Sequence, residues 1–386
     1  MSGPEFCPSP RRIRRGAALT LVFATVLATA AATNALPREG EGGHSASLAV
    51  HPAGATVVQE AVARAAAEAV AEGKSGAKAA EEVVSRSGDR WGAVYDQQEY
   101  EKFQQALDGE YTGVGLWARR SGDGRVEVYK VQPGGPADRA GIRAGDRLHA
   151  IDGRVVDDRP VTDVVALLRG KDRTTVALGL ERAGRDWTRT LTRTTLSTES
   201  VTVQKLKGGA VMIKVASFTR GSGARVREAV RAAPDGAGVL LDLRGNAGGL
   251  VTEAVAAASA FLDGGLVATY DMRGKQRALH ADPGGDTERP VVALVDGGTM
   301  SAAELVTGAL KDRGRAVTVG SRTFGKGSVQ MPSTLPDGSV AELTVGHYRT
   351  PSGQSVDGQG ITPDLAADEG AEEQAQSVLS GLGTGS

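Results

Sequence analysis

Residues 296–330 read DGGTMSAAELVTGALKDRGRAVTVGSRTFGKGSVQ, and this stretch decides the fold class. An apolar strand is predicted just before it, at 291–295, and a glycine pair follows that strand. Ser301 then begins a segment with apolar residues at helical spacing, and a second strand is predicted at 316–319. This order of strand, helix and strand predicts an α/β fold.

Ser301 and Lys326 are the two residues of this stretch that could carry chemistry. A serine at a helix start is ordinarily an N-cap. The same position also suits a nucleophile, because the backbone N–H groups of a helix start can stabilise an oxyanion. Lys326 stands between Gly325 and Gly327, which let the backbone pack closely around it. That setting is unusual for a solvated charge.

Five motifs carry a resemblance to a known family. They are TMSAAEL (299–305), ALKDRGRA (309–316), RTFGKGSVQ (322–330), DLRGNAGG (242–249) and TPSGQSVDGQGITPD (350–364). In order and spacing they resemble the carboxyl-terminal processing peptidases, also called tail-specific proteases, over roughly residues 80–366. The resemblance implies that Ser301 is the nucleophile, that Lys326 is the general base and that Gln330 orients the lysine.

The residue types suit that chemistry. A serine hydroxyl needs a neighbouring base to take its proton. A lysine can be that base only when it is neutral, and its ordinary pKa of about 10.4 must be lowered by burial. Phe324 and Val329 flank Lys326 and are predicted to form an apolar pocket around it. Gln330 can accept a hydrogen bond from the amine without a charge that would keep the lysine protonated.

The resemblance also implies an oxyanion hole and a set of supporting residues. The loop 242–249 lies between a predicted strand and a predicted helix, an arrangement that forms anion-binding backbone nests. The amide of Gly248 or Gly249 is expected to pair with that of Ala302. Ala247 stands where the family usually has proline. Glu304, Asp312 and Thr323 match polar positions of the family, although Glu304 could simply be a helix-start acid and Asp312 a cap or a partner of Arg313 or Arg315.

A second domain is indicated by QPGGPADRAGI (132–142), AGD (144–146) and IDG (151–153), which resemble a PDZ domain. Such a domain binds a peptide as an added strand and holds its terminal carboxylate on backbone amides. The resemblance places those amides at Thr112–Leu116 and implies that the domain gates the protease. Arg169 matches a position that can link the domain to the core, or is a helix-end arginine. The expected binding loop consists of Thr112, Gly113, Val114, Gly115 and Leu116, with Val114 and Leu116 as pocket walls.

Three other interpretations compete with a serine–lysine peptidase. Residues 320–326 spell GxxxxGK, but a phosphate-binding loop needs Ser or Thr next and a helix after it. A Ser-His-Asp protease, including a PDZ-bearing chaperone-protease, is disfavoured because none of the five histidines stands in a triad motif. The main alternative is a non-catalytic PDZ-containing peptide-binding protein. The intact Ser301, Lys326 and Gln330 argue against it.

Composition and the N-terminus bear on location. The 386 residues carry a net charge of −1, which implies no attraction to nucleic acid. No metal or cofactor is implied. The arginines of 11–15 precede an apolar run, 17–32, that ends in small residues, and this pattern predicts export. Both a cleaved signal peptide and a single-span anchor fit, and in either case the enzyme lies outside the cytoplasmic membrane.

The predicted fold is α/β, with a PDZ domain and a peptidase core that resembles a crotonase-like mixed sheet. The expected partners are protein substrates with free apolar C-termini, and membrane anchoring and assembly as a homo-oligomer stay open. The predicted order is a signal peptide or signal anchor at 1–36, a linker and short N-terminal helical region at 37–109, a PDZ domain at 110–193, a serine peptidase core at 194–370 and a disordered tail at 371–386.

Overall fold

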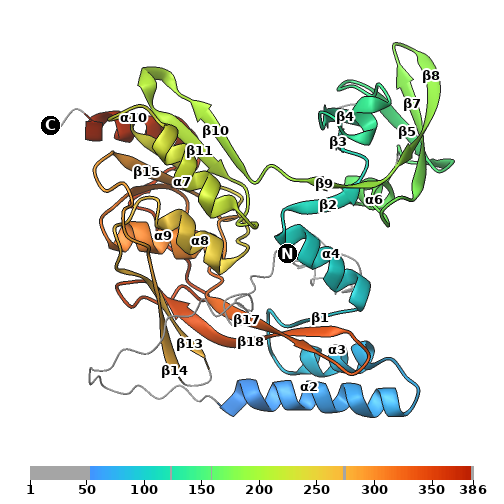
Figure 1. Ribbon diagram of the computed structural model, residues 1–386, viewed down its shortest axis with the longest axis horizontal. Coiled ribbons are helices and arrows are strands. Elements are labelled where there is room, and N and C mark those ends of the chain that lie inside the picture. The colour runs from blue at the N-terminus through green and yellow to red at the C-terminus, as the bar shows by residue number, and fades with distance from the viewer. Residues whose placement is uncertain (1–52, 122–123, 158, 273–274, 384–386) are drawn as a thin grey trace, which may run out of the picture.

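The computed structural model describes residues 53–121, 124–157, 159–272 and 275–383. The predicted export segment at 1–36 lies outside these residues. Three parts follow one another along the chain in Figure 1: N-terminal helices, a small β-rich domain set to one side, and a larger α/β core. The prediction of an α/β fold is confirmed.

A six-stranded sheet forms the centre of the core. Its strand order is β10-β11-β12-β15-β16-β19, with β10 antiparallel to β11 and the other pairs parallel. Helices cover both faces of its central strands, which explains why those strands are continuous apolar runs. The bounds are β10 Val201–Lys205, β11 Val211–Val215, β12 Val239–Asp242, β15 Val291–Val295, β16 Val317–Gly320 and β19 Leu365–Ala366, with a short 3-10 helix, η1, at Lys207–Gly209.

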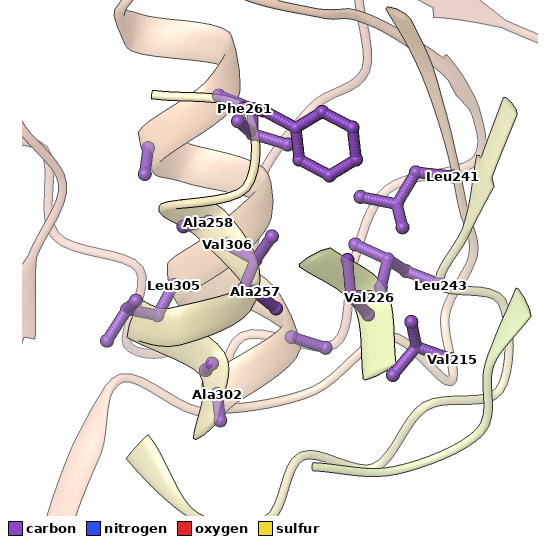
Figure 2. Close-up of a cluster of buried hydrophobic side chains, with 14 of the residues drawn as sticks. Val215, Val226, Leu241, Leu243, Ala257, Ala258, Phe261, Ala302, Leu305 and Val306 are labelled. Atoms are coloured by element: carbon purple, nitrogen blue, oxygen red, sulfur yellow. The ribbon is translucent and has the colours of Figure 1, made fainter. Parts of the chain in front are cut away.

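The larger apolar cluster lies between this sheet and three helices, α7 (Ser222–Ala232), α8 (Val251–Ala258) and α9 (Ala302–Asp312). Successive side chains of a strand point to opposite faces, so Ile213 packs in this cluster and Met212 on the other face. The cluster reaches the first turn of α9, which follows Ser301. Figure 2 shows part of it, including Val226, Leu241, Leu243, Phe261, Ala302, Leu305 and Val306.

The C-terminal segment differs from the prediction of a disordered tail. Residues Ala371–Gly383 form a helix, α10, on the sheet face opposite α7, α8 and α9. Ala371, Ala375 and Leu379 recur every four residues and are buried against Met212, Leu240 and neighbouring strand residues. The small, acidic composition hid this apolar stripe, which is enough to dock one face of a helix.

A second sheet joins the N-terminal helices to the core. β17 and β18 form a hairpin, β1 pairs with β18 and β18 also pairs with β13, which pairs with β14. Two of the N-terminal helices, α2 and α3, pack on the hairpin. The bounds are α2 Ala53–Ala71, α3 Gly76–Arg86, β1 Ala93–Tyr95, α4 Gln97–Leu107, β13 Leu266–Met272, β14 Lys275–His280, β17 Ser328–Thr334 and β18 Val340–Arg349.

The small domain has its own apolar core and its own sheet, in the order β3-β4-β5-β7-β8, with β6 on β5. β3 lies at the end of this order. The chain enters the domain through β2 and leaves through β9, and these two strands pair with each other (Figure 1). The bounds are β2 Glu110–Gly113, β3 Leu116–Arg120, β4 Val126–Val131, α5 Pro136–Arg139, β5 Arg147–Ile151, β6 Arg154–Val155, α6 Val161–Leu168, β7 Thr175–Arg182, β8 Arg185–Thr192 and β9 Thr194–Ser197.

Candidate active site

Ser301 lies at the sharp turn between the central strand β15 and helix α9. Its backbone has φ 57° and ψ −115°, a combination that is costly for a residue with a side chain. The residue is 2% exposed. Such strain is found where the surrounding structure fixes a functional side chain, because packing on both sides over-determines the turn.

Glu304 connects Ser301 to Lys326. Its Oε2 atom accepts the backbone N–H of Ser301 and the backbone N–H of Lys326, each at 2.9 Å. Its Oε1 atom accepts the N–H of Gly325 at 2.7 Å and the hydroxyl of Thr323 at 2.5 Å. Burial raises the pKa of Glu304, and these hydrogen bonds oppose that rise. Glu304 is therefore a buried connector between two loops and more than a helix-start acid.

Lys326 is fully buried, and its Nζ atom has no hydrogen-bond partner among the described residues. Nζ lies 4.8 Å from the centroid of the Trp91 ring. Burial lowers the pKa of Lys326 to about 8, while the carboxylates of Glu342, Asp89 and Glu304 oppose that change. A lysine in this setting loses its proton far more readily than an exposed one.

The apolar surroundings of Lys326 differ from the prediction. Phe324 is 40% exposed and touches the edge of the Trp91 ring, with ring centroids 5.7 Å apart. Val329 is buried in the main core cluster. The aromatic wall over the amine is thus Trp91, a residue outside the predicted site. It precedes β1 and is more than 200 positions away from Lys326 in the chain.

Gln330 uses only half of its amide. Its Nε2 atom donates to the hydroxyl of Ser328 at 2.8 Å and to that of Thr344 at 3.3 Å. Its Oε1 atom is buried and has no hydrogen-bond partner within the described part of the chain. The hydrogen bond from Lys326 to Gln330 is therefore absent in this arrangement, and the role of Gln330 in orienting the lysine stays a prediction.

Asp89 fixes the position of Trp91. Its Oδ1 atom accepts the N–H groups of Trp91 and Gly92 at 3.0 and 2.9 Å. The same carboxylate accepts the backbone N–H and the hydroxyl of Thr344, each at 2.8 Å. These bonds connect the N-terminal segment to β18 beside Gln330. An aromatic residue two positions after an aspartate gives little signal in a single sequence.

The predicted oxyanion hole lies beside Ser301. A Cβ added to Gly248 would come within 3.1 Å of Ser301 Cβ and 3.2 Å of the Ala302 nitrogen. The Gly248 N–H, however, donates to the side chain of Asn246 at 2.9 Å. Gly249 is the better choice of donor for that reason. Its φ of 135° and its contact with the Phe218 carbonyl both require glycine.

A small apolar cavity adjoins Ser301. Its volume is about 10 Å³, which is room for about one water molecule. Tyr348 lies in its wall and donates its hydroxyl to the Ser301 carbonyl at 3.0 Å. The lining residues are Val251, Tyr270, Leu279, Ser301, Ala302, Leu305, Ser328, Val329 and Tyr348.

The expected peptide-binding loop is only partly available. Thr112 and Gly113 belong to β2 and pair with β9. Val114 is 2% exposed in the core of the small domain, and its carbonyl accepts the Ala137 N–H at 2.9 Å. Packing therefore encloses Val114 in this arrangement, and its role as a pocket wall stays a prediction. Gly115 is buried with φ 76°, and Leu116 is half-buried at the start of β3.

The remaining predicted residues have structural partners. The Arg169 guanidinium lies 5.7 Å from the centroid of the Tyr111 ring, on the strand that enters the small domain. Asp312 accepts the Ser352 N–H at 2.9 Å, instead of pairing with Arg313 or Arg315. Thr323 also accepts the Ile361 N–H at 2.7 Å.

The described residues hold neither a cluster suited to a metal ion nor a membrane-spanning helix. Over those ranges no group of three or more His, Cys, Asp or Glu residues is placed to hold a metal ion. Within the same ranges no helix is long and apolar enough to cross a membrane.

Comparisons with known proteins agree with this geometry. The chain matches the model of peptidase family S41 over residues 209–367 and that of the PDZ domain over 127–182. It is 31% identical over 291 residues to the "Carboxy-terminal processing protease CtpA" of Bacillus subtilis (strain 168), covering 74% of this chain and 62% of that protein. It is 32% identical over 292 residues to a "Probable CtpA-like serine protease" of Staphylococcus aureus (strain N315), covering 74% and 58%.

A solved structure is similar over more of its length. The photosystem II D1 C-terminal processing protease is 31% identical, with a TM-score of 0.50, over 80% of this chain and 86% of that one. The chain belongs to peptidase family S41, among the PDZ-containing C-terminal processing proteases, and the resemblance found in its motifs is confirmed. It spans less than two thirds of the length of the curated bacterial relatives.

Proposed function

We propose that the protein is an exported serine endopeptidase that recognises the C-terminal tails of protein substrates and cleaves with a Ser301–Lys326 dyad. Neutral Lys326 takes the Ser301 hydroxyl proton as the oxygen attacks the scissile carbonyl. The N–H groups of Gly249 and Ala302 stabilise the resulting oxyanion. Lys326 then gives the proton to the leaving amine, and water releases the acyl group by the same steps.

The observation that carries this proposal is the shared oxygen of Glu304. Because Oε2 accepts the backbone N–H groups of both Ser301 and Lys326 at 2.9 Å, the two loops are fixed side by side. The strained Ser301 backbone and the buried amine of Lys326 add to this support. A structural capping role for Ser301 would explain the bond to Glu304, but it would not require a buried lysine in the adjacent loop.

The dyad forms when the lysine side chain turns. Nζ now lies over Trp91 without a hydrogen bond, and Gln330 Oε1 is a buried acceptor without a donor. A rotation that moves the amine from the ring to Gln330 would satisfy both groups at once. The amide would then hold the amine toward Ser301 without keeping it charged.

Tail recognition rests on the small domain. β3 is the last strand in its sheet order, so one edge is available for an added peptide strand. The backbone around Gly115 and Leu116 stands at the start of that edge and supplies the amides for a terminal carboxylate. Export is proposed on the arginines of 11–15 and the apolar run 17–32.

The test uses the full-length protein and unfolded substrates that differ only in their last residues. Ser301→Ala and Lys326→Ala are each expected to lower kcat by more than about 1000-fold while the chain stays folded. Lys275→Ala, which changes an exposed lysine on β14, serves as the control and should cleave normally. Cleavage by Lys326→Ala at the wild-type rate would exclude the dyad. Tail binding without cleavage by the wild-type chain would indicate the non-catalytic alternative.

A further inference from the structure

The sheet formed by β1, β18 and β17 gathers polar side chains on one face. In the strand register Gln330 lies opposite Thr344, and Glu342 lies opposite both Pro332 and Ala93. Alternate residues of a strand point to the same face, so Gln330, Thr344 and Glu342 share one. The bond from Gln330 to Thr344 agrees with that placement. Lys326, two residues before β17, lies beside this face.

The carboxylates near Lys326 are not equally satisfied. Asp89 accepts four hydrogen bonds and so does Glu304. Glu342 is fully buried, and neither of its oxygens has a hydrogen-bond partner among the described residues. Lys326 Nζ is in the same condition. A buried acid and a buried amine, each without a hydrogen-bond partner, are poorly placed to carry independent charges.

We propose that Glu342 is a positioning residue for the proposed peptidase reaction, whose charge acts on Lys326 and so sets the pH at which the amine becomes a base. The proposal rests on the proposed function, because it concerns the proposed general base. Glu342 does not touch the scissile bond. It acts through the charge that it presents to Lys326.

The two groups titrate as a pair. Burial raises the pKa of Glu342 to about 8, and burial lowers the pKa of Lys326 to about 8. At low pH the acid is neutral and the amine is an ammonium. Loss of the first proton to solvent leaves one proton for both groups, and an ionised Glu342 favours keeping it on the amine. Loss of the second proton leaves the amine free to accept from Ser301.

Other titratable groups face this interior from the elements around it. Asp89 and Glu304 also favour the ammonium form of Lys326, but their hydrogen bonds are already made. Burial raises the pKa of Tyr95 and of Tyr100, and ionised Glu342 raises both further. The titratable groups that surround Lys326 and Glu342 are therefore Asp89 from the segment after α3, Glu304 from α9, Tyr95 from β1 and Tyr100 from α4.

The kinetic experiment is the pH profile of kcat/KM for the full-length protein and its Glu342→Gln variant. Glutamine has nearly the same shape and no charge. The acid limb of the profile, which is the rise of kcat/KM with pH on its acid side, should therefore shift to lower pH by about one unit. Well below the midpoint this shift gives about tenfold more activity. Glu342→Asp keeps a carboxylate and should stay nearer to the wild-type profile. A limb that stays in place or moves up in Glu342→Gln, or an aspartate variant that behaves like glutamine, would overturn the proposal.

Glu99→Gln is the matched control. Glu99 lies in the first turn of α4 and acts on Tyr95, but it is not among the carboxylates that act on Lys326. Glutamine can still close the capping box with Asp96. The acid limb of this variant should match the wild type.

A direct titration separates this inference from the proposed function. Lysine labelled with ¹³C at Cε gives a signal for Lys326, assigned by its loss in Lys326→Arg, whose midpoint can be followed by NMR. The midpoint should fall in Glu342→Gln and not in Glu99→Gln. If the midpoint moves but the chain has no peptidase activity, the coupling of Glu342 to Lys326 is supported and the proposed function is wrong. If the midpoint does not move and the enzyme is active, the proposed function is supported and the coupling is wrong.

Stability gives a third readout with a definite sign. Because the pKa of Glu342 is higher in the folded chain, the folded state holds a proton that the unfolded chain releases above pH about 4.5. Wild-type stability should therefore fall as the pH rises from about 4.5 to about 8, through this group. Glu342→Gln lacks that loss, so its thermal midpoint should exceed the wild type by more at pH 8 than at pH 4.5. An equal gap at both pH values would count against a buried, proton-bearing acid.

Discussion

Lys326 Nζ lies over the face of Trp91, 4.8 Å from the ring centroid. The contact joins the N-terminal segment to the Lys326 loop of a domain that begins more than 100 residues later. It gives the amine an electrostatic partner that excludes water. The segment after α3 is thus part of the candidate site, because it supplies Trp91 and the aspartate, Asp89, that holds it in place.

Replacing Trp91 by alanine should move the acid limb of activity to higher pH. The indole both attracts the ammonium and keeps water away, and burial is the largest cause of the lowered pKa of Lys326. Opening the site to water should therefore raise that pKa toward its ordinary value and lower kcat/KM at neutral pH about tenfold. Trp187→Ala removes another tryptophan that lies under arginines in the PDZ domain, and it should leave the limb unchanged. A limb that moved to lower pH would show that the ring acts mainly through its attraction for the charge.

Gly248→Ala should lower kcat by at least about 100-fold with little change in KM, as expected when an oxyanion site is displaced. The new methyl group would press against Met300 and Ser301 at 3.1 Å, in a backbone conformation with φ 102°. Gly245→Ala is the control in the same loop, since its added Cβ meets no atom within 4 Å. Steady-state kinetics would distinguish the two variants. Similar losses in both would mean that backbone strain, which they share, is the cause.

A free C-terminal tail should stimulate cleavage of a reporter that has no tail. Gating means that the PDZ domain has an open arrangement, in which it leaves the proposed active site accessible. A peptide that binds this arrangement more tightly shifts the population toward it. Peptides with free and amidated C-termini form the comparison, because only the free carboxylate can bind the amides at Gly115 and Leu116. Equal rates with both peptides, or unchanged activity after deletion of residues 112–190, would show that the domain only tethers substrate.

Truncating Leu379 to alanine should destabilise the core by about 2–5 kcal/mol. The side chain is 4% exposed and fills the space beside Gly238, on the sheet face that α10 covers. Leu382 on the same helix is 46% exposed, and its truncation should change stability by less than about 0.5 kcal/mol. Denaturant unfolding measures both. Equal effects would mean that α10 does not dock as described.

The sequence predicted the parts of the site that lie in continuous motifs. Ser301 and Lys326 stand in short segments whose strand, turn and helix signals are strong, and the structure brings their loops together. Trp91, Asp89 and Glu342 escaped selection because they meet only when β1 pairs with β18, across about 250 residues of chain. The burial of Val114 was not predicted, because burial depends on packing, which a glycine-rich motif does not reveal.

Because β2 and β9 pair with each other, the PDZ domain is an insertion whose two ends lie side by side. Glu110 lies opposite Ser197 in this pair of strands, and the Thr198 N–H donates to the Gly109 carbonyl at 2.6 Å. The chain therefore leaves the remainder of the protein and returns to it at nearly the same place. Genetic loss or exchange of the whole module would need only a short turn at that junction, and the two halves of the host would keep their contacts. Recognition and cleavage can in this way evolve separately within one chain.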